Sequence, residues 1–573
     1  MFTTRPEIQG SFGVIASTHW LASAAGWAIL ESGGNAFDAA VTAGLCLQVV
    51  EPHRAGPGGE VPIIFYSAAS DSVGVINGQG PAPADASIDR FRALNIEFVP
   101  GVGLLSACVP GSFDAWMRLL GEHGTVSLRS ALQYAIEYAE VGYPILPAIA
   151  RDIGSAEDLF RREWPSSAEL WLANGVPAPR SRFQNHALAA TFHRIVEEAE
   201  NTTNDRDEQI QAARHAFYRG FVADAIHNFV STFGDPDGAE TTNRGFLTGH
   251  DLAAYEAGDE QPTSREYRGH TVYKTGPSTQ GPVFLQQLAL LEGFDLRSLG
   301  HNSSDYIHTI VECAKLAFAD REAWYGDPEF VDVPMDGLLS SAYAAERRAL
   351  VGPEAATTSA PGSVDRRQPH LPPALPLPGR GTTAVNVVDR HGNLVSACPS
   401  GGLLQFSPAI PGLGFSISER AQAFYLDEDH PNSLVGGKRP RTTLSPSLAA
   451  KGDQPCMAFA TPGGDRQDQW SLAFFLAHVD FDMNLQEAID APLFHSTHWP
   501  RSFHPHDAYP KRLLIEASIP AAVREELRRR GHDVVIVDEW SLGWVSAVAR
   551  DTDTGIVRGA ASPREMQAYA IGR

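Results

Sequence analysis

Two adjacent threonines in Gly381-Thr382-Thr383 form the part of the sequence best suited to chemistry. β-Branched residues follow them, and the turn His391-Gly392-Asn393 leads into a second strand, which predicts a β-hairpin. A chain cut before Thr382 would expose a threonine that carries both a nucleophilic hydroxyl and a basic α-amine. This pair is one of the recurring solutions for amide cleavage. The sequence therefore suggests self-cleavage between Gly381 and Thr382.

A proline-rich segment, residues 355–381, runs into this hairpin. It has few apolar residues to anchor it, so we expect an irregular linker. The prolines are Pro361, Pro369, Pro372, Pro373, Pro376 and Pro378. From these residues alone, a surface loop that enters an ordinary hairpin is the favoured interpretation, which the rest of the chain reverses.

Composition narrows the class of protein. At 573 residues we expect two domains or one large layered body. The net charge of −23 argues against a nucleic-acid surface, which needs basic clusters. No apolar run approaches the ~20 residues of a membrane span, and no leader precedes the first elements, so we expect no membrane partner and a cytoplasmic location. Five scattered cysteines indicate neither disulfides nor a zinc motif.

Helices are expected before Thr382 and strands after it. Before it, we expect a strand at 14–17, helices at 21–32 and 36–50, a strand at 61–66, helices through 128–214, a strand at 269–274, a helix at 283–292, and a long helix capped by Ser304 and closed by Gly326. After it, we expect strands within 445–460, a helix at 520–530, a strand at 534–537 and a hairpin of 545–549 with 556–560.

Neither a cofactor nor a metal is predicted. The glycine-dense loop 51–60 lacks the GxGxxG pattern of a dinucleotide site, although its glycines could bring backbone close to a ligand. His495, His498, His504 and His506 lie among prolines and aromatic residues, without a second pair at a helical offset. We interpret these histidines as part of a solvated loop.

Taken in order, these segments resemble the γ-glutamyltransferase (glutathione hydrolase) family of N-terminal nucleophile hydrolases, over nearly the whole chain. The resemblance rests on Ala24 to Glu51, Val109-Pro110-Gly111, Phe217 to Gly220, Asp251 to Tyr255, Tyr267-Arg268-Gly269, Leu316 to Arg321, Gly326-Asp327-Pro328, the Thr382 hairpin, Lys438-Arg439-Pro440, Ser445-Pro446 and Thr461 to Gly464.

The resemblance implies an α+β fold, a four-layer αββα sandwich made as one precursor. Residues 1–381 would form a large chain that ends in the 355–381 linker, and residues 382–573 a small chain, together a heterodimer in one layered body. By the same resemblance, Thr382 is the nucleophile, Thr383 its companion and Ser400 a second hydroxyl that contacts it. Gly463 and Gly464 match the oxyanion-hole glycines, whose N–H groups would stabilise developing negative charge.

The substrate pocket departs from the family pattern. Gln79 stands where the family's arginine binds the glutamyl α-carboxylate, and Thr442-Thr443 replaces a Ser-Ser pair. Gly402, Arg420 and Ala423 align with the residues that hold the α-amine, although the loop 403–413 leaves the register of the last two open. Losing such charge-assisted contacts removes roughly 1.5–3 kcal/mol each.

Three functions follow from this pattern. The first is a threonine amidohydrolase or acyltransferase that acts on a small acyl amide other than an ordinary γ-glutamyl compound, similar to oxamate amidohydrolase or cephalosporin acylase. The second is a true γ-glutamyl hydrolase or transferase with a rearranged pocket. The third is a non-catalytic relative, which retention of Thr382, Ser400 and the two glycines disfavours. Arg420 is either a solvated surface residue or the cation that receives a substrate carboxylate.

Overall fold

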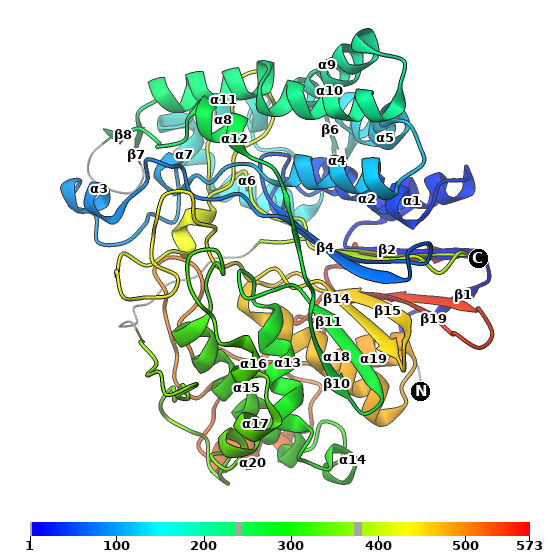
Figure 1. Ribbon diagram of the computed structural model, residues 1–573, viewed down its shortest axis with the longest axis vertical. Helices are drawn as coiled ribbons and strands as arrows, with labels where there is room; N and C mark the ends of the chain where they lie inside the picture. The colour runs from blue at the N-terminus through cyan, green and yellow to red at the C-terminus, as the bar shows by residue number, and fades with distance from the viewer. Residues whose placement is uncertain (1–2, 237–241, 372–380) are drawn as a thin grey trace.

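The computed structural model describes residues 3–236, 242–371 and 381–573. Two seven-stranded sheets lie face to face between an upper and a lower layer of helices (Figure 1). The predicted α+β architecture with two sheets is confirmed, and its neighbouring strands are antiparallel. Most of the proline-rich end of the linker, 372–380, lies outside the described residues.

The first sheet holds the hairpin that follows Thr382 at its centre. Its order is β21-β2-β12-β13-β3-β4-β9. β12 (Val385–Asp389) pairs with β2 (Gly13–Ser17) and with β13 (Leu394–Ala397), so the predicted hairpin is confirmed, with its first strand beginning at Val385. The other strands are β3 (Val61–Ser67), β4 (Ser72–Gly78), β9 (Gly258–Glu260) and β21 (Tyr569–Gly572).

The second sheet has the order β1-β20-β19-β15-β14-β11-β10. Its strands are β1 (Ile8–Gly10), β10 (Thr263–Tyr267), β11 (His270–Lys274), β14 (Ser447–Lys451), β15 (Gln454–Ala460), β19 (Ser546–Arg550) and β20 (Val557–Ala561). A smaller sheet joins β16 (Phe494–Ser496), β17 (Arg512–Glu516) and β18 (Asp533–Val537). Short aliphatic side chains, among them Val14, Val388 and Val548, fill the space between the two large sheets.

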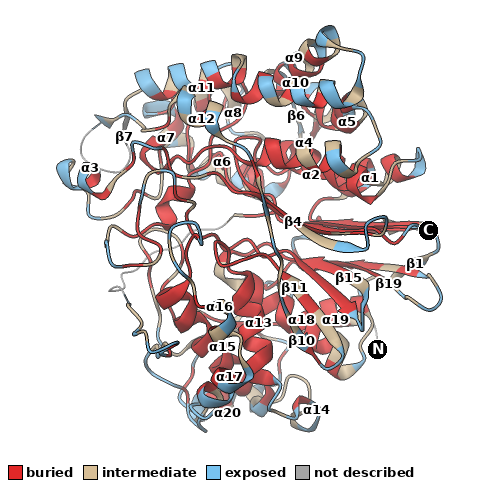
Figure 2. Cartoon of the chain, in the orientation of Figure 1, coloured by how far each residue is buried: buried red, intermediate tan, exposed pale blue. Residues whose placement is uncertain are grey.

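The helices bury the outer faces of both sheets (Figure 2). Those on the side of the first sheet include α1 (Trp20–Glu31), α2 (Ala36–Val50), α4 (Ser112–His123), α5 (Leu128–Val141), α9 (His186–Thr202), α10 (Arg206–Tyr218) and α11 (Phe221–Thr232). Those on the side of the second sheet include α13 (Gly281–Leu291), α15 (Ser304–Trp324), α17 (Ser341–Arg348), α18 (Gln467–Phe481), α19 (Leu485–Asp490) and α20 (Ala521–Arg529). Shorter helices are α3 (Ile88–Ala93), α6 (Pro147–Ser155), α7 (Glu157–Arg162), α8 (Pro165–Trp171), α12 (Gly249–Ala254), α14 (Leu296–Leu299) and α16 (Met335–Leu338).

Capping residues at the helix starts explain which of the predicted helix bounds agree with the structure. The helix predicted at 36–50 has those bounds, because Asn35 and Asp38 form a reciprocal capping box at its start. For α15, the prediction of Ser304 as the cap is wrong: Ser303 caps the helix by accepting from the N–H of Tyr306. Among the described residues, no helix is long and apolar enough to cross a bilayer.

The interpretation of a solvated histidine loop is also wrong. His495, His498 and His506 are buried, and His504 is partly buried. His495 lies in β16, and the ring of His506 stacks on Tyr425. The prolines and aromatic residues around these histidines therefore belong to packed structure that covers the end of α18 and β17.

The packing of α2 against α4 yields a stability prediction. A Cβ at Gly44 would lie 2.2 Å from the ring of Trp116, so Gly44→Ala should overpack this contact. We expect the free energy of unfolding to fall by about 1–3 kcal/mol, measured by denaturant titration. Gly121→Ala on α4 is the matched control, since its nearest neighbour would be 3.7 Å away. Equal stability of the two variants would contradict the packing described.

Candidate active site

Thr382 lies at the entrance to β12, buried and in a strained backbone conformation. Its φ is +122°, a region that β-branched residues rarely adopt. Such strain costs of order 1–3 kcal/mol and persists only where the surrounding structure enforces it. Here Thr383 enforces it, because its N–H and its hydroxyl both donate to the Pro399 carbonyl, at 2.9 and 3.0 Å. The strain lies at the Thr382 N–Cα bond, directly after the peptide bond that links Gly381 to Thr382.

A chain of buried polar groups runs from Thr382 to a carboxylate. The Thr382 Oγ1 lies 3.2 Å from the Ser400 Oγ, which accepts a 2.9 Å hydrogen bond from the Arg420 guanidinium. Arg420 in turn donates through Nε to Glu60 at 2.6 Å and forms an ion pair with it. All four residues are at most 3% exposed. The structure therefore excludes the surface position considered for Arg420.

Glu60 escaped the sequence interpretation, although it ends the glycine-dense loop. Its backbone exchanges hydrogen bonds with that of Ser400, at 2.8 and 2.9 Å. The glycines before it permit this approach, since a Cβ at Gly59 would lie 2.1 Å from the Ser400 carbonyl oxygen. The available sequence signal was an acidic residue directly after a run of glycines, because such a run permits close approach to another segment. Its partner, 360 residues away, had no local signature.

Gly463 and Gly464 form the turn that enters α18, with φ of +137° and +60°. Glycine is required at Gly463, where a Cβ would lie 2.5 Å from Trp470. Neither backbone N–H donates a hydrogen bond within the described part of the chain. Phe503 connects this turn to Arg420: its ring centroid lies 5.2 Å from the Arg420 Cζ, and a Cβ at Gly464 would lie 3.2 Å from the ring.

The remaining predicted residues gather in a second group. The Gln79 amide donates to the Pro440 carbonyl, and the Thr442 N–H donates to the Ser278 carbonyl at 2.9 Å. Thr443 is buried, and its hydroxyl has no partner among the described residues. This group adjoins Thr382 through apolar packing, because Leu444 and Ala384 share one small cluster.

A cavity of about 470 Å³ opens beside Gly464. Phe503, Trp499 and Tyr509 give it aromatic walls, and Arg466 and Arg512 also line it. The cavity is large enough for part of a small organic molecule. The cavity therefore adjoins the glycine turn that enters α18.

Two buried acids make the free energy of unfolding depend on pH. Burial raises the pKa of Glu419 to about 7, although the neighbouring Arg420 opposes the rise. Burial also raises the pKa of Glu51 to about 7, against the attraction of Arg54. Glu51 accepts a 2.6 Å hydrogen bond from Thr18, whose N–H donates to the Ala384 carbonyl two residues after Thr382. Both acids are therefore protonated in the fold at pH values where they ionise when unfolded.

We predict that Glu419→Gln flattens this dependence. A carboxyl whose folded pKa exceeds its unfolded value loses stability as pH rises from about 4.5 to about 7. Relative to Glu419→Gln, the parent's free energy of unfolding should fall across that window, by up to about 1.4 kcal/mol per pH unit. Denaturant titrations at several pH values measure it, with Glu51→Gln as the matched second variant. A constant difference between parent and Glu419→Gln would contradict the protonated state.

Comparison with known proteins agrees with this geometry. Residues 22–572 match the family model for gamma-glutamyltranspeptidase. The chain is 31% identical to the glutathione hydrolase-like YwrD proenzyme of Bacillus subtilis, over 97% of this chain and 98% of that one. It is 32% identical to the acylase ACY 1 proenzyme of a Pseudomonas species, over 96% and 92%, and 29% identical to the oxamate amidohydrolase proenzyme of Klebsiella pneumoniae, over 97% and 98%. The solved structure of LmbA2991HD is 47% identical and superposes over all of both chains with a TM-score of 0.96. The chain belongs to the gamma-glutamyltranspeptidase family and is an N-terminal nucleophile amidohydrolase of that family.

Proposed function

We propose that this protein cuts itself between Gly381 and Thr382 and then hydrolyses a small acyl amide through Thr382. The observation that carries the proposal is the buried Thr382 hydroxyl, 3.2 Å from Ser400, on a residue with a strained φ of +122°. The relatives named as proenzymes support it, because that word describes a chain processed after synthesis. The products would be a chain of residues 1–381 and a chain of residues 382–573, held together as a heterodimer.

Self-cleavage needs no group beyond this chain and water. The Thr382 Oγ1 attacks the Gly381 carbonyl carbon, the hydroxyl proton passes to the Thr382 nitrogen, and the C–N bond breaks, so that the Gly381 acyl group moves from nitrogen to oxygen. Water hydrolyses the resulting ester, which leaves a Gly381 carboxylate and a Thr382 with a free α-amine. Relief of the strain at φ +122° favours the first step.

The mature Thr382 would use the same hydroxyl on a substrate amide. Its α-amine takes the hydroxyl proton, the hydroxyl oxygen forms an ester with the acyl group, and the amine product leaves with a proton. Water then releases the acid; an acceptor amine would give transfer instead. In this proposal Gly463 and Gly464 donate to the tetrahedral oxygen, because their N–H groups are not engaged by any residue that the structure describes. Ser400, oriented by Arg420, holds the Thr382 oxygen in place.

The acyl group would differ from an ordinary γ-glutamyl group. Gln79 supplies no positive charge where the family's arginine would bind a carboxylate, and its amide is already engaged by Pro440. Arg420 supplies the alternative. Its Nε and one terminal nitrogen serve Glu60 and Ser400, whereas Nη1 makes no hydrogen bond to any described residue. We infer that Nη1 receives a carboxylate or carbonyl oxygen that lies close to the scissile amide, as in an oxamate-like substrate.

A γ-glutamyl substrate is the second candidate. The Thr443 hydroxyl favours it, because this buried group has no partner in the described part of the chain and stands where the family's paired hydroxyls bind the glutamyl carboxylate. Substrate tests separate the two candidates. The cytoplasmic location and the choice between hydrolysis and transfer stay predictions.

We predict that the purified protein runs as two chains on a denaturing gel, the smaller beginning Thr-Thr-Ala-Val-Asn. Thr382→Ala should remain one full-length chain because it lacks the attacking oxygen. Thr382→Ser is the matched control: it keeps a hydroxyl and should still be cut. Cleavage of Thr382→Ala at the parent's rate would exclude Thr382 as the nucleophile.

We predict that Arg420→Lys lowers kcat/KM on amides with an adjacent carboxylate more than on neutral amides of the same size. Lysine keeps the charge opposite Glu60 but loses the planar donor set, so the selective loss should be roughly ten- to a hundred-fold, or about 1.5–3 kcal/mol. Steady-state kinetics on matched anionic and neutral amides, with γ-glutamyl anilide as a third substrate, measure it.

The double variant Arg420→Ala/Glu60→Gln controls for the buried charge that a single alanine would leave unpaired. This variant should lose the preference for anionic over neutral amides. Self-cleavage is measured separately on a denaturing gel. Equal losses on anionic and neutral amides would reduce Arg420 to a support for Ser400. Efficient turnover of the γ-glutamyl anilide would favour the second candidate.

A further inference from the structure

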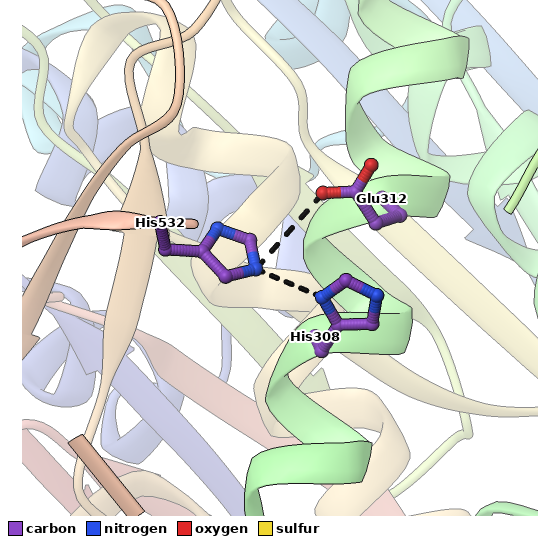
Figure 3. Close-up of side chains that lie close together, drawn as sticks. All are labelled: His308, Glu312 and His532. Atoms are coloured by element: carbon purple, nitrogen blue, oxygen red, sulfur yellow. Dashed lines mark hydrogen bonds and ion pairs between the residues drawn. The ribbon is translucent and has the colours of Figure 1, made fainter. Parts of the chain in front are cut away.

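Three buried side chains converge in the lower helix layer, away from the residues of the candidate active site. His308 and Glu312 stand one turn apart on α15, and His532 lies in the turn between α20 and β18 (Figure 3). The His308 Nδ1 lies 2.9 Å from the His532 Nε2, and the latter lies 4.0 Å from a Glu312 oxygen. The three side chains are at most 4% exposed. Two imidazole nitrogens and a carboxylate oxygen thus face one point.

The surroundings orient these groups as ligands. The His308 Nε2 lies 2.8 Å from the Gly352 carbonyl oxygen, so Nε2 carries the proton and the Nδ1 lone pair faces the cluster. In this structure Nδ1 accepts from the His532 Nε2–H, and an ion at the cluster has to displace that proton. A ring N–H that donates to a backbone carbonyl is the usual support of a metal-bound histidine. The second Glu312 oxygen accepts from the Ala356 N–H at 3.1 Å, which leaves the first oxygen facing the histidines.

Donor types and spacing select the kind of ion. A set of two imidazoles and one carboxylate suits zinc and its neighbours, with bonds of about 2.0–2.2 Å. Ligand atoms around such an ion are about 3.4 Å apart in a tetrahedral arrangement, which lies between the two separations seen here. The i, i+4 spacing on α15 places His308 and Glu312 on one face of the helix.

Lys315 is the competing cation. Its ammonium donates to the Glu312 oxygen that faces the histidines, at 2.7 Å, and to the Ala356 carbonyl at 3.0 Å. An ion at the cluster has to displace the hydrogen bond from Lys315 to Glu312, whereas the hydrogen bond from Lys315 to the Ala356 carbonyl can remain. Lys315 therefore offers a way to distinguish a metal site from a cluster that an ammonium completes.

We propose that His308, Glu312 and His532 bind one divalent transition-metal ion of the zinc class. Two of the ligands precede Thr382 and the third follows it. Gly352 and Ala356 form hydrogen bonds with the ligands and lie where the 355–381 linker begins. The Ala355 N–H donates to the carbonyl of Arg530, two residues before His532. The ion would fasten both chains and the base of the linker at one point. That fastening role rests on the proposed cleavage; the binding of the ion does not.

The first experiment measures metal content and binding. Chelator-treated protein should take up about one Zn²⁺ or Co²⁺ per chain by elemental analysis and calorimetry, with a cobalt absorption spectrum of a four-coordinate site. His532→Ala should abolish uptake and the Zn²⁺-dependent rise in Tm. His478→Ala, which removes a half-buried histidine bonded to a backbone carbonyl elsewhere, should change neither. Uptake unchanged in His532→Ala would overturn the proposal.

The second experiment uses Lys315→Met. Removal of the competing ammonium should lower the Kd for Zn²⁺ at least about tenfold. If the substitution lowers the Tm, added Zn²⁺ should raise it again. If the ammonium itself completes the cluster, the variant will be destabilised and will bind no ion, which would refute the site. Uncut Thr382→Ala protein should bind the ion like the parent, so failure of self-cleavage and failure of metal binding give different results.

Discussion

A buried network of ion pairs around Arg321 and Glu322 supports the candidate site. Arg321, at the end of α15, pairs with Glu322 and with Asp465, the residue after Gly464. Arg441, directly before Thr442-Thr443, donates to Glu322 at 2.9 Å. Burial alone would raise the pKa of Asp465, but Arg321 and hydrogen bonds from Ser502 hold it at about 2. One network thus fixes both the glycine turn and the paired threonines, and removal of any member would leave a buried charge without its partner.

The pair of Glu60 and Arg420 plays the corresponding part on the other side of Thr382. A buried ion pair adds little to stability when compared with apolar packing of the same volume. The role of this ion pair is to orient the Arg420 guanidinium, so that one of its nitrogens donates to Ser400. The Ser400 hydroxyl then has a fixed acceptor role toward Arg420 and its remaining capacity faces Thr382. The same pairing lowers the net charge of the pocket, so selectivity for an anion would come from donor geometry more than from charge.

Sequence patterns predicted the elements whose signals are local. The capping box at Asn35 set the start of α2, and β-branched residues set the β12–β13 hairpin. Adjacent serines could not be ranked as caps of α15, because both have the same chemistry and only the chain path decides. The histidines near 500 were misplaced because burial depends on contacts with distant segments. Thr382 was proposed from the Gly-Thr-Thr hairpin, and Ser400 and Arg420 from the resemblance. Glu60 and the Arg321 network join segments more than 100 residues apart and required the structure.

The strand order of the two sheets limits when the proposed cleavage could occur. In the first sheet, β12 lies between β2 and β13, and β13 lies next to β3, so strands from before and after Thr382 interleave. In the second, β20, β19, β15 and β14 are flanked by β1 and by β11 with β10. Neither part can complete a sheet by itself. The uncut chain therefore carries the folding information, and a cut protein that unfolded would have to reassemble two chains at finite concentration. Its persistence would be governed by the rate of unfolding rather than by an equilibrium with a refoldable state.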